Sequence, residues 1–148
     1  MQVVESSSSR SDSGSPNQHP LRVFLVEDSA VIRERLTETI SALDHVEVIG
    51  HAETEAGAIE ALQRLPIDAV VLDLQLKQGH GFNVLKSLRA HPDRPRVTVL
   101  VLTNFASSQY RGRSMDFGAD YFFDKSREYD RLCDVLVELA SRRTQNLD

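Results

Sequence analysis

Hydrophobic positions follow two alternating periods along the chain from Leu21 onward. Short stretches rich in apolar residues, typical of buried strands, recur five times. Each is followed by a stretch with apolar residues three or four positions apart, typical of a helix. The stretch 29–43, for example, places Leu36 and Ile40 on one helical face behind a serine that can cap its first turn. The pattern predicts strands at 21–27, 46–53, 67–73, 96–103 and 119–123, and helices at 29–43, 55–65, 81–91, 106–118 and 128–143.

The order of these elements predicts an α/β fold. Strands that are apolar throughout are usually buried on both faces, which is typical of parallel sheets. A helix after each strand supplies the right-handed crossovers that neighbouring parallel strands need. We therefore expect a five-stranded parallel sheet with helices on both faces.

The length of 148 residues and the apolar content of 41% are typical of one globular domain with a substantial core. We assign this domain to residues 21–143. Residues 1–20 contain seven serines and no aliphatic or aromatic residue after Val4, which predicts a disordered leader. Residues 144–148 are expected to form a short tail.

Charge and hydropathy narrow the classes of partner. The net charge of −5 gives no long-range attraction for nucleic acid, and the basic residues are scattered along the chain, so we predict no nucleic-acid partner. The apolar runs are too short to span a bilayer, and the amino terminus lacks the apolar segment of a signal peptide. We therefore predict a cytoplasmic protein that does not contact a membrane.

Charged and hydroxyl residues stand at the ends of the predicted strands. Glu27 and Asp28 follow the first strand, Asp73 ends the third, Thr103 ends the fourth, and Lys125 lies just past the fifth. The carboxyl ends of parallel strands share one edge of the sheet, where ligands of α/β proteins bind. Carboxylates gathered there must be neutralised by a divalent cation or a buried lysine. Oxygen ligands without histidine or cysteine favour Mg²⁺.

The histidines share no spacing typical of a metal site, and we predict that each is solvated or bonded locally. They are His19, His45, His51, His80 and His91. His80 alone lies in the loop that follows Asp73.

In the order and spacing of the strand-end residues, the chain resembles the receiver domain of two-component response regulators. That family has an acidic pair after the first strand, a phosphoacceptor aspartate after the third, threonine or serine after the fourth, and lysine after the fifth. Asp28, Asp73, Thr103 and Lys125 are separated by 45, 30 and 22 residues, as the family spacing requires. The resemblance covers residues 21–143 and implies the flavodoxin-like (βα)5 receiver fold.

The resemblance also implies a chemistry. Asp73 would take a phosphoryl group from a sensor histidine kinase or a histidine phosphotransfer protein. Asp28 would bind Mg²⁺ directly, Glu27 would bind it through water, and Gln75 through its backbone carbonyl. Lys125 would contact a phosphoryl oxygen. Such a protein is no conventional enzyme, but it catalyses its own phosphorylation and dephosphorylation.

The same resemblance assigns a switch to Thr103 and Phe122. The Thr103 hydroxyl would bind the phosphoryl group, and Phe122 would follow it inward and change the surface over the last two predicted helices and the last strand. That surface would contact a kinase, an adaptor or a second copy of the chain. Its rim carries Arg111, Arg113, Arg127 and Arg131. The side chains of Gln75 and Asn104 would set the rate of autodephosphorylation.

The chain departs from the family pattern at several positions. Glu27 replaces the commoner aspartate, Lys77 stands where proline is usual, and Asn104, in place of alanine or glycine, should narrow access to the site. Ser126 replaces a proline that usually follows a cis bond. A cis bond before serine costs about 3–4 kcal/mol. Because Lys125 must still reach the phosphoryl group, we nevertheless expect the cis form.

Alternative functions remain open. Because few residues follow the last predicted helix, we expect a stand-alone receiver without an effector domain. One alternative is a relay intermediate that passes its phosphate onward. A second is a haloacid-dehalogenase-like phosphatase, but that class has a second acid where this chain has Gln75. A third is a pseudo-receiver that works without phosphorylation, and the complete set of five strand-end residues argues against it.

Overall fold

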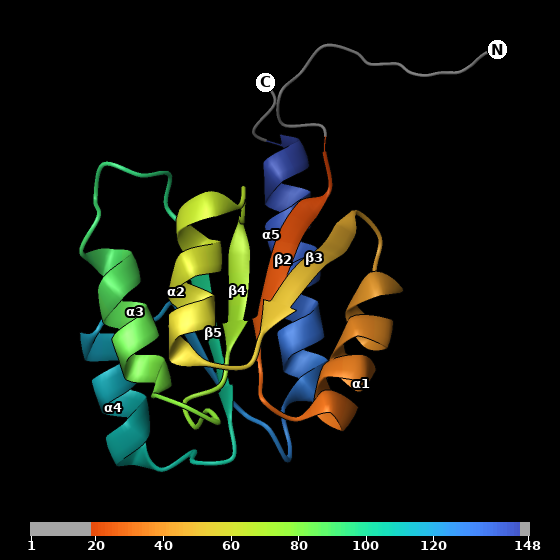
Figure 1. Ribbon diagram of the computed structural model, residues 1–148. Coiled ribbons are helices and arrows are strands. Elements are labelled where there is room, and N and C mark those ends of the chain that lie inside the picture. The colour runs from red at the N-terminus through yellow and green to blue at the C-terminus, as the bar shows by residue number, and fades with distance from the viewer. Residues whose placement is uncertain (1–18, 146–148) are drawn as a thin grey trace, which may run out of the picture.

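The computed structural model describes residues 19–145 of the protein (Figure 1). The predicted leader, 1–20, lies outside the described residues except for its last two positions. The predicted tail, 144–148, lies outside them except for its first two. Both remain predictions.

The structure contains every predicted strand and helix, in the predicted order, with boundaries shifted by a few residues. The strands are β2 (Leu21–Val26), β3 (Val46–Ala52), β4 (Ala69–Leu72), β5 (Thr98–Thr103) and β6 (Tyr121–Asp124). The helices are α1 (Ala30–Ser41), α2 (Glu55–Arg64), α3 (Gly81–Arg89), α4 (Ser108–Asp116) and α5 (Tyr129–Gln145). Within residues 19–145, no helix is long and apolar enough to cross a membrane.

The five strands form one parallel sheet in the order β3-β2-β4-β5-β6. In Figure 1, α1 and α5 lie on one face of the sheet and α2, α3 and α4 on the other. The predicted fold class is therefore confirmed. The chain forms β3 on one side of β2 and then crosses to form β4 on the other side. Such a reversal point is where open α/β sheets bind their ligands.

The two-residue period of the strands divides the core into two layers. In β4, Val70 and Leu72 pack in the apolar cluster under α2 and α3, whereas Ala69 and Val71 belong to the cluster under α1 and α5. All four side chains are buried. Burial on both faces explains why this strand has no polar position between its ends.

At the amino ends of the strands, Asp68 joins β2 to the last helix. Its carboxylate accepts hydrogen bonds from the backbone and side chain of Arg22 at 2.8 and 3.2 Å and pairs with Arg143 of α5 at 3.2 Å. The ring of His19 lies 2.7 Å from the Arg143 guanidinium and 3.9 Å from Asp68. The ring of His19 also lies 2.7 Å from the carbonyl oxygen of Pro20, so the predicted local bonding of this histidine is present but incomplete. Its contacts with Arg143 and Asp68 join distant parts of the chain and leave no local sequence signal.

Gly112 lies in the middle of α4, where an added Cβ would meet no atom within 4 Å. Glycine inside a helix costs about 0.5–1 kcal/mol relative to alanine because it loses more backbone entropy on folding. We expect Gly112→Ala to raise the free energy of unfolding by about that amount, as measured by urea denaturation.

At Gly81, in contrast to Gly112, the structure leaves no space for a side chain. A Cβ there would lie 2.5 Å from the carbonyl oxygen of Asp73 and 2.8 Å from the Cα of Leu74. The backbone beside Asp73 would have to shift, so Gly81→Ala should lower the free energy of unfolding by about 1 kcal/mol or more. If Gly112→Ala were also destabilising, α4 would not be a regular helix around that position.

Candidate functional site

The register of β2 and β4 brings two acidic residues together. Val26 pairs with Leu72 at the last rung of the ladder, and an acid follows each of them directly. The backbone N–H of Asp73 continues the ladder by donating to the carbonyl of Val26 at 3.0 Å. Glu27 and Asp73 therefore leave adjacent strands at the same edge of the sheet, at the reversal point of the strand order.

Lys125 links these two acids. Its Nζ lies 2.5 Å from Oε1 of Glu27 and 2.8 Å from Oδ2 of Asp73. The residue follows β6, so its side chain crosses the end of β5 to reach them. Glu27, Asp73 and Lys125 are 3%, 6% and 6% exposed. Charges this buried need such partners, because an unpaired ion in the interior is very unfavourable.

The remaining oxygens of both acids are bound by backbone N–H groups. Oε2 of Glu27 accepts a hydrogen bond from Ser29 at 2.9 Å, and Oδ1 of Asp73 accepts one from Gln75 at 3.2 Å. Ser29 also caps α1, as predicted, through its hydroxyl. These bonds fix the direction in which each carboxylate points.

Burial and charge act against each other in this cluster. Burial raises the pKa of the Glu27 carboxyl above its ordinary value, although the hydrogen bonds from Lys125 and Ser29 act in the opposite direction. Burial would lower the pKa of Lys125, but the hydrogen bonds and charges of Asp73 and Glu27 together raise it above its ordinary value. Lys125 is thus a cation at neutral pH despite its burial.

Glu27, Asp28 and Asp73 fit a divalent cation. One carboxylate oxygen from each lies within 4.8 Å of the others. Among the described residues, the half-buried Asp28 carboxylate has no hydrogen-bond or ion-pair partner. It is therefore the acid in this group whose oxygens are free. Oxygen donors of this kind suit Mg²⁺, which binds one or two carboxylates and keeps several waters.

Thr103 ends β5, between the strands that carry Asp73 and Lys125. Its carbonyl accepts the backbone N–H of Lys125 at 2.9 Å, and its Oγ1 accepts that of Phe105 at 3.1 Å. The Thr103 side chain is fully buried. Its hydroxyl is held by a bond that it accepts, so its own proton is still available to donate.

The bond between Lys125 and Ser126 is trans, since the described backbone contains no cis peptide bond. The expected cis form is wrong, and Lys125 nonetheless reaches the acids. Ser126 donates its backbone N–H and its hydroxyl to Oδ1 of Asp124 at 2.9 and 2.7 Å. Proline has neither group, so a proline at this position could not make the two bonds that stabilise the turn.

The loop after Asp73 is held by residues that the sequence did not single out. Glu55 accepts hydrogen bonds from the backbone N–H of His80 at 3.0 Å and from the side chain of Asn83 at 3.1 Å. His80 caps α3 by accepting the N–H of Phe82 at 3.1 Å, as the prediction of local bonding requires. The partners of Glu55 are 25 and 28 residues away in the sequence, so only the three-dimensional structure reveals its role.

The residues predicted to set the dephosphorylation rate are exposed, whereas the predicted switch residue Phe122 is buried. Gln75 and Asn104 are exposed at the rim of the site. Phe122 is buried, and the guanidinium of Arg111 lies over its ring at 4.8 Å from the centroid. Arg113 likewise lies over an aromatic ring rather than in an ion pair. The structure thus brings Glu27, Asp28, Asp73 and Lys125 together, whereas Phe122 is buried beneath Arg111.

Comparison of the sequence with known families gives one match, to the response regulator receiver domain, over residues 23–137. A nitrate/nitrite response regulator protein homolog from Haemophilus influenzae is 30% identical over 83% of this chain. A protein-glutamate methylesterase/protein-glutamine glutaminase from Anaeromyxobacter dehalogenans is 31% identical, also over 83%. The chain spans 58% of the first relative and 36% of the second.

Solved structures give the same fold. The signal receiver domain of a protein described as a Luxo repressor from Vibrio parahaemolyticus matches with a TM-score of 0.75 and 26% identity, over 86% of this chain and 95% of that one. The signal receiver domain of NarL from Mycobacterium tuberculosis has the same TM-score at 22% identity, over 83% and 98%.

Lys125→Met would leave the carboxylates of Glu27 and Asp73 buried without a cation. We expect the free energy of unfolding at pH 7 to fall by about 3 kcal/mol, measured by urea denaturation in the presence of a chelator. Arg142→Met is the matched control, because it breaks the exposed pair with Glu138 and should cost less than about 1 kcal/mol.

The pH dependence gives a second test. Because the folded pKa of Lys125 lies above 10.5, its stabilisation is complete below that pH and is lost as the pH rises through the folded value. The difference between wild type and Lys125→Met should therefore shrink at strongly alkaline pH. A difference that stays constant there would mean that lost packing, and not the ion pair, explains the effect.

Proposed function

The chain belongs to the response regulator receiver domain family, and we propose that Asp73 is its phosphoacceptor. The observation that carries this proposal is the buried Lys125 ammonium between Glu27 and Asp73 at the carboxyl edge of the sheet. A fixed cation beside a carboxylate can stabilise the negative charge of a phosphoryl group as it arrives, without reorganising solvent.

We assign the attack to Oδ1 of Asp73. Oδ2 is bound to Lys125 at 2.8 Å, whereas Oδ1 accepts only the longer bond from Gln75 at 3.2 Å. Oδ1 forms a bond to phosphorus while the P–N bond of a donor phosphohistidine breaks. The imidazole leaves with the bonding electrons and takes up a proton, and the product is an acyl phosphate on Asp73.

Mg²⁺ belongs to the same proposal, because it would neutralise charge on the nucleophile and the phosphoryl group. Asp28 and Asp73 would bind it directly, with the backbone carbonyl of Gln75. Glu27 would act through water, since Lys125 and Ser29 already engage both of its oxygens. The free carboxylate of Asp28 supports this division of roles.

The response to phosphorylation would pass through Thr103 and Phe122. The Thr103 hydroxyl would donate its free proton to the phosphoryl group. Phe122 lies on the neighbouring strand beneath Arg111, which also donates to the Phe122 carbonyl at 3.4 Å. A shift of Phe122 would therefore move Arg111 and alter the surface formed by α4, β6 and α5.

The proposed partners are a sensor histidine kinase or a phosphotransfer protein as donor, and a kinase, an adaptor or a second copy of the chain on the surface of α4, β6 and α5. A cytoplasmic location belongs to the same proposal.

The alternative with most support is a relay that passes phosphate from Asp73 to a histidine-containing transfer protein. Its support is the open rim of the site, where Gln75 and Asn104 are exposed. The haloacid-dehalogenase-like reaction has less support, because Gln75 cannot act as the general acid of that mechanism.

The first prediction for this function concerns the acceptor. On incubation with Mg²⁺ and acetyl phosphate, the wild-type chain should gain the mass of one phosphoryl group, and Asp73→Asn should gain none. Asp93→Asn, which changes an exposed acid away from the site, should label like wild type. If Asp73→Asn still labels and Asp28→Asn does not, the acceptor is wrongly assigned.

The second prediction concerns the lifetime of the acyl phosphate. Gln75 and Asn104 flank the path of the hydrolytic water, so Gln75→Ala or Asn104→Ala should change the first-order rate of phosphate loss severalfold while the urea midpoint stays the same. Gln109→Ala, at an exposed position on α4, should leave the rate unchanged. Decay at the wild-type rate in both site variants would contradict these roles.

The third prediction concerns output. Beryllofluoride, which mimics the phosphoryl group on Asp73, should shift the amide signals of residues 104–125 and tighten binding to a kinase, an adaptor or a second copy of the chain. Asp73→Asn should show neither change. Shifts limited to the loops of Asp28, Asp73 and Lys125, together with rapid phosphate exchange with a transfer protein, would favour the relay.

A further inference from the structure

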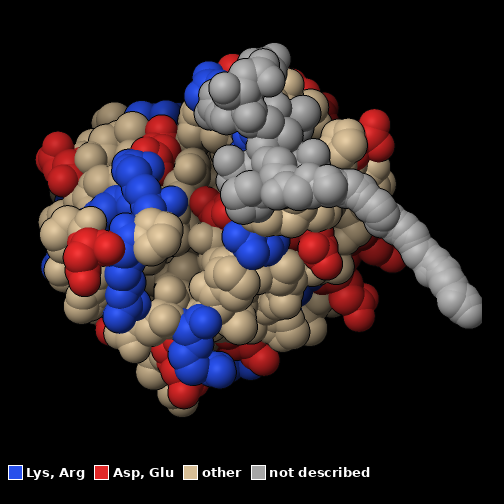
Figure 2. Space-filling view, turned by 90° about the horizontal axis from the view of Figure 1, so that it is seen from above, with Lys and Arg blue, Asp and Glu red and all other residues tan. Residues whose placement is uncertain are grey.

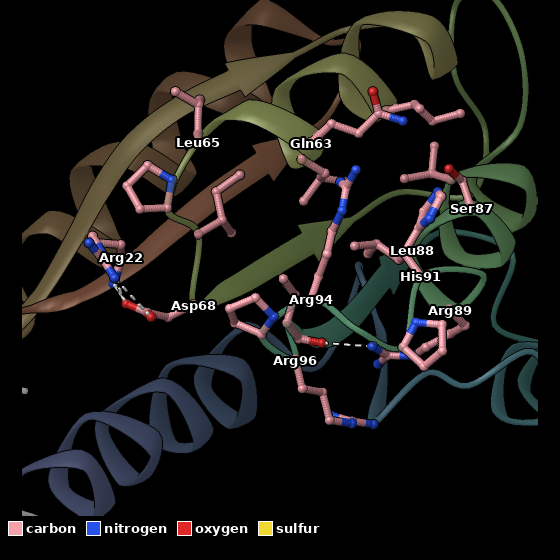
Figure 3. A pocket seen from close by; sticks show the side chains of 18 residues that line it. Arg22, Gln63, Leu65, Asp68, Ser87, Leu88, Arg89, His91, Arg94 and Arg96 are labelled. Atoms are coloured by element: carbon pink, nitrogen blue, oxygen red, sulfur yellow. Dashed lines mark hydrogen bonds and ion pairs between the residues drawn. The ribbon is translucent and has the colours of Figure 1, made fainter.

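A pocket of about 470 Å³ opens at the end of the sheet opposite to the acid cluster. It lies at the amino ends of β4 and β5, between the carboxyl-terminal ends of α2 and α3 (Figure 3). Its volume is within the range of small-molecule sites in proteins. The family chemistry proposed above uses no residue of this pocket.

The interior of the pocket is apolar. Leu62 of α2, Val84 of α3 and Val97 before β5 line it and are buried, and Leu65 and Leu88 are half-buried beside them. A concave apolar surface of this kind gains free energy by covering an apolar ligand group. Three prolines, Pro66, Pro92 and Pro95, also line the pocket and restrict its loops.

The rim of the pocket is basic, although the chain as a whole carries a net charge of −5. Four arginines line the pocket against one acid, Asp68. Figure 2 looks down on this end of the molecule and shows a band of blue side chains beside a hollow in the surface. The charge around the pocket is thus opposite in sign to that of the protein, which favours an anionic ligand.

Three of the four arginines already have partners. Arg22 pairs with Asp68, while Arg89 and Arg96 both pair with Asp120. Within residues 19–145, the guanidinium of Arg94 has no hydrogen-bond or ion-pair partner. In Figure 3 its side chain extends from the loop before β5 toward Gln63 on the α2 side of the pocket. Arg94 is therefore the cation available to a ligand.

We propose that this pocket binds a small amphipathic anion, a carboxylate joined to an apolar chain or ring. The apolar part lies against Leu62, Val84 and Leu88, and the carboxylate pairs with Arg94. A guanidinium suits this role because its planar donors match the two oxygens of a carboxylate.

Two carboxylates and one uncharged analogue separate the contributions of charge and shape. Octanoate and 4-phenylbutyrate carry an aliphatic and an aromatic body, and 1-octanol has the aliphatic body without the charge. We expect saturable binding of at least one carboxylate with a dissociation constant below about 1 mM. Its shifts in ¹H–¹⁵N spectra should gather at residues 62–68 and 84–97, and 1-octanol should bind more weakly than octanoate.

Two variants assign the binding to this pocket. Arg94→Gln removes the free cation and should weaken carboxylate binding about fivefold, while 1-octanol is unaffected. Ser87→Trp places a large ring in the pocket and should weaken all three probes. Arg64→Gln is the matched control, because Arg64 is exposed on α2 outside the pocket and should bind every probe like wild type.

Several results would overturn the proposal. They are the absence of saturable carboxylate binding, spectral shifts centred on Asp73 instead of the pocket, and equal carboxylate affinity in wild type and Arg94→Gln. Because Arg94 is exposed and unpaired, its substitution should not affect folding, so that variant remains informative even if Ser87→Trp unfolds.

Discussion

The carboxyl edge of this sheet depends on one buried lysine, because two acidic side chains lie there in the protein interior. Two strands that end in buried apolar residues deliver Glu27 and Asp73 to adjacent points in the interior, where an unpaired charge would be very unfavourable. Lys125 neutralises both by reaching across β5. The strand order, the length of β6 and the turn at Ser126 all contribute to the place from which that side chain starts.

Lys125 alone does not balance the charge of this cluster. With Lys125 paired to both acids and Asp28 still free, the cluster has one cation against three carboxylates. The proposed Mg²⁺ would neutralise this remaining negative charge before a phosphoryl group arrives.

The sequence predicted the strands and helices, because a continuous apolar run or a three-to-four spacing is a local property. It also predicted which residues meet at the strand ends, since parallel strands share an edge. It did not reveal Glu55, which fixes the loop of His80, because that contact joins residues 25 positions apart without a periodic signal. It predicted the wrong isomer before Ser126, because the bonds from Ser126 to Asp124 depend on the turn itself.

The net charge of −5 conceals a separation of charge between the two ends of the sheet. β4 begins next to Asp68 at the basic rim of the pocket and ends at Asp73 in the acid cluster, so one strand of four residues connects the two environments. Each of the two sites contains a side chain without a hydrogen-bond or ion-pair partner in the described part of the chain, Asp28 in the acid cluster and Arg94 at the pocket. The net charge does not show this separation, which arises because parallel strands place all their amino ends at one edge of the sheet and all their carboxyl ends at the other. The two proposed ligands are accordingly opposite in charge: a cation beside Asp28 and an anion beside Arg94.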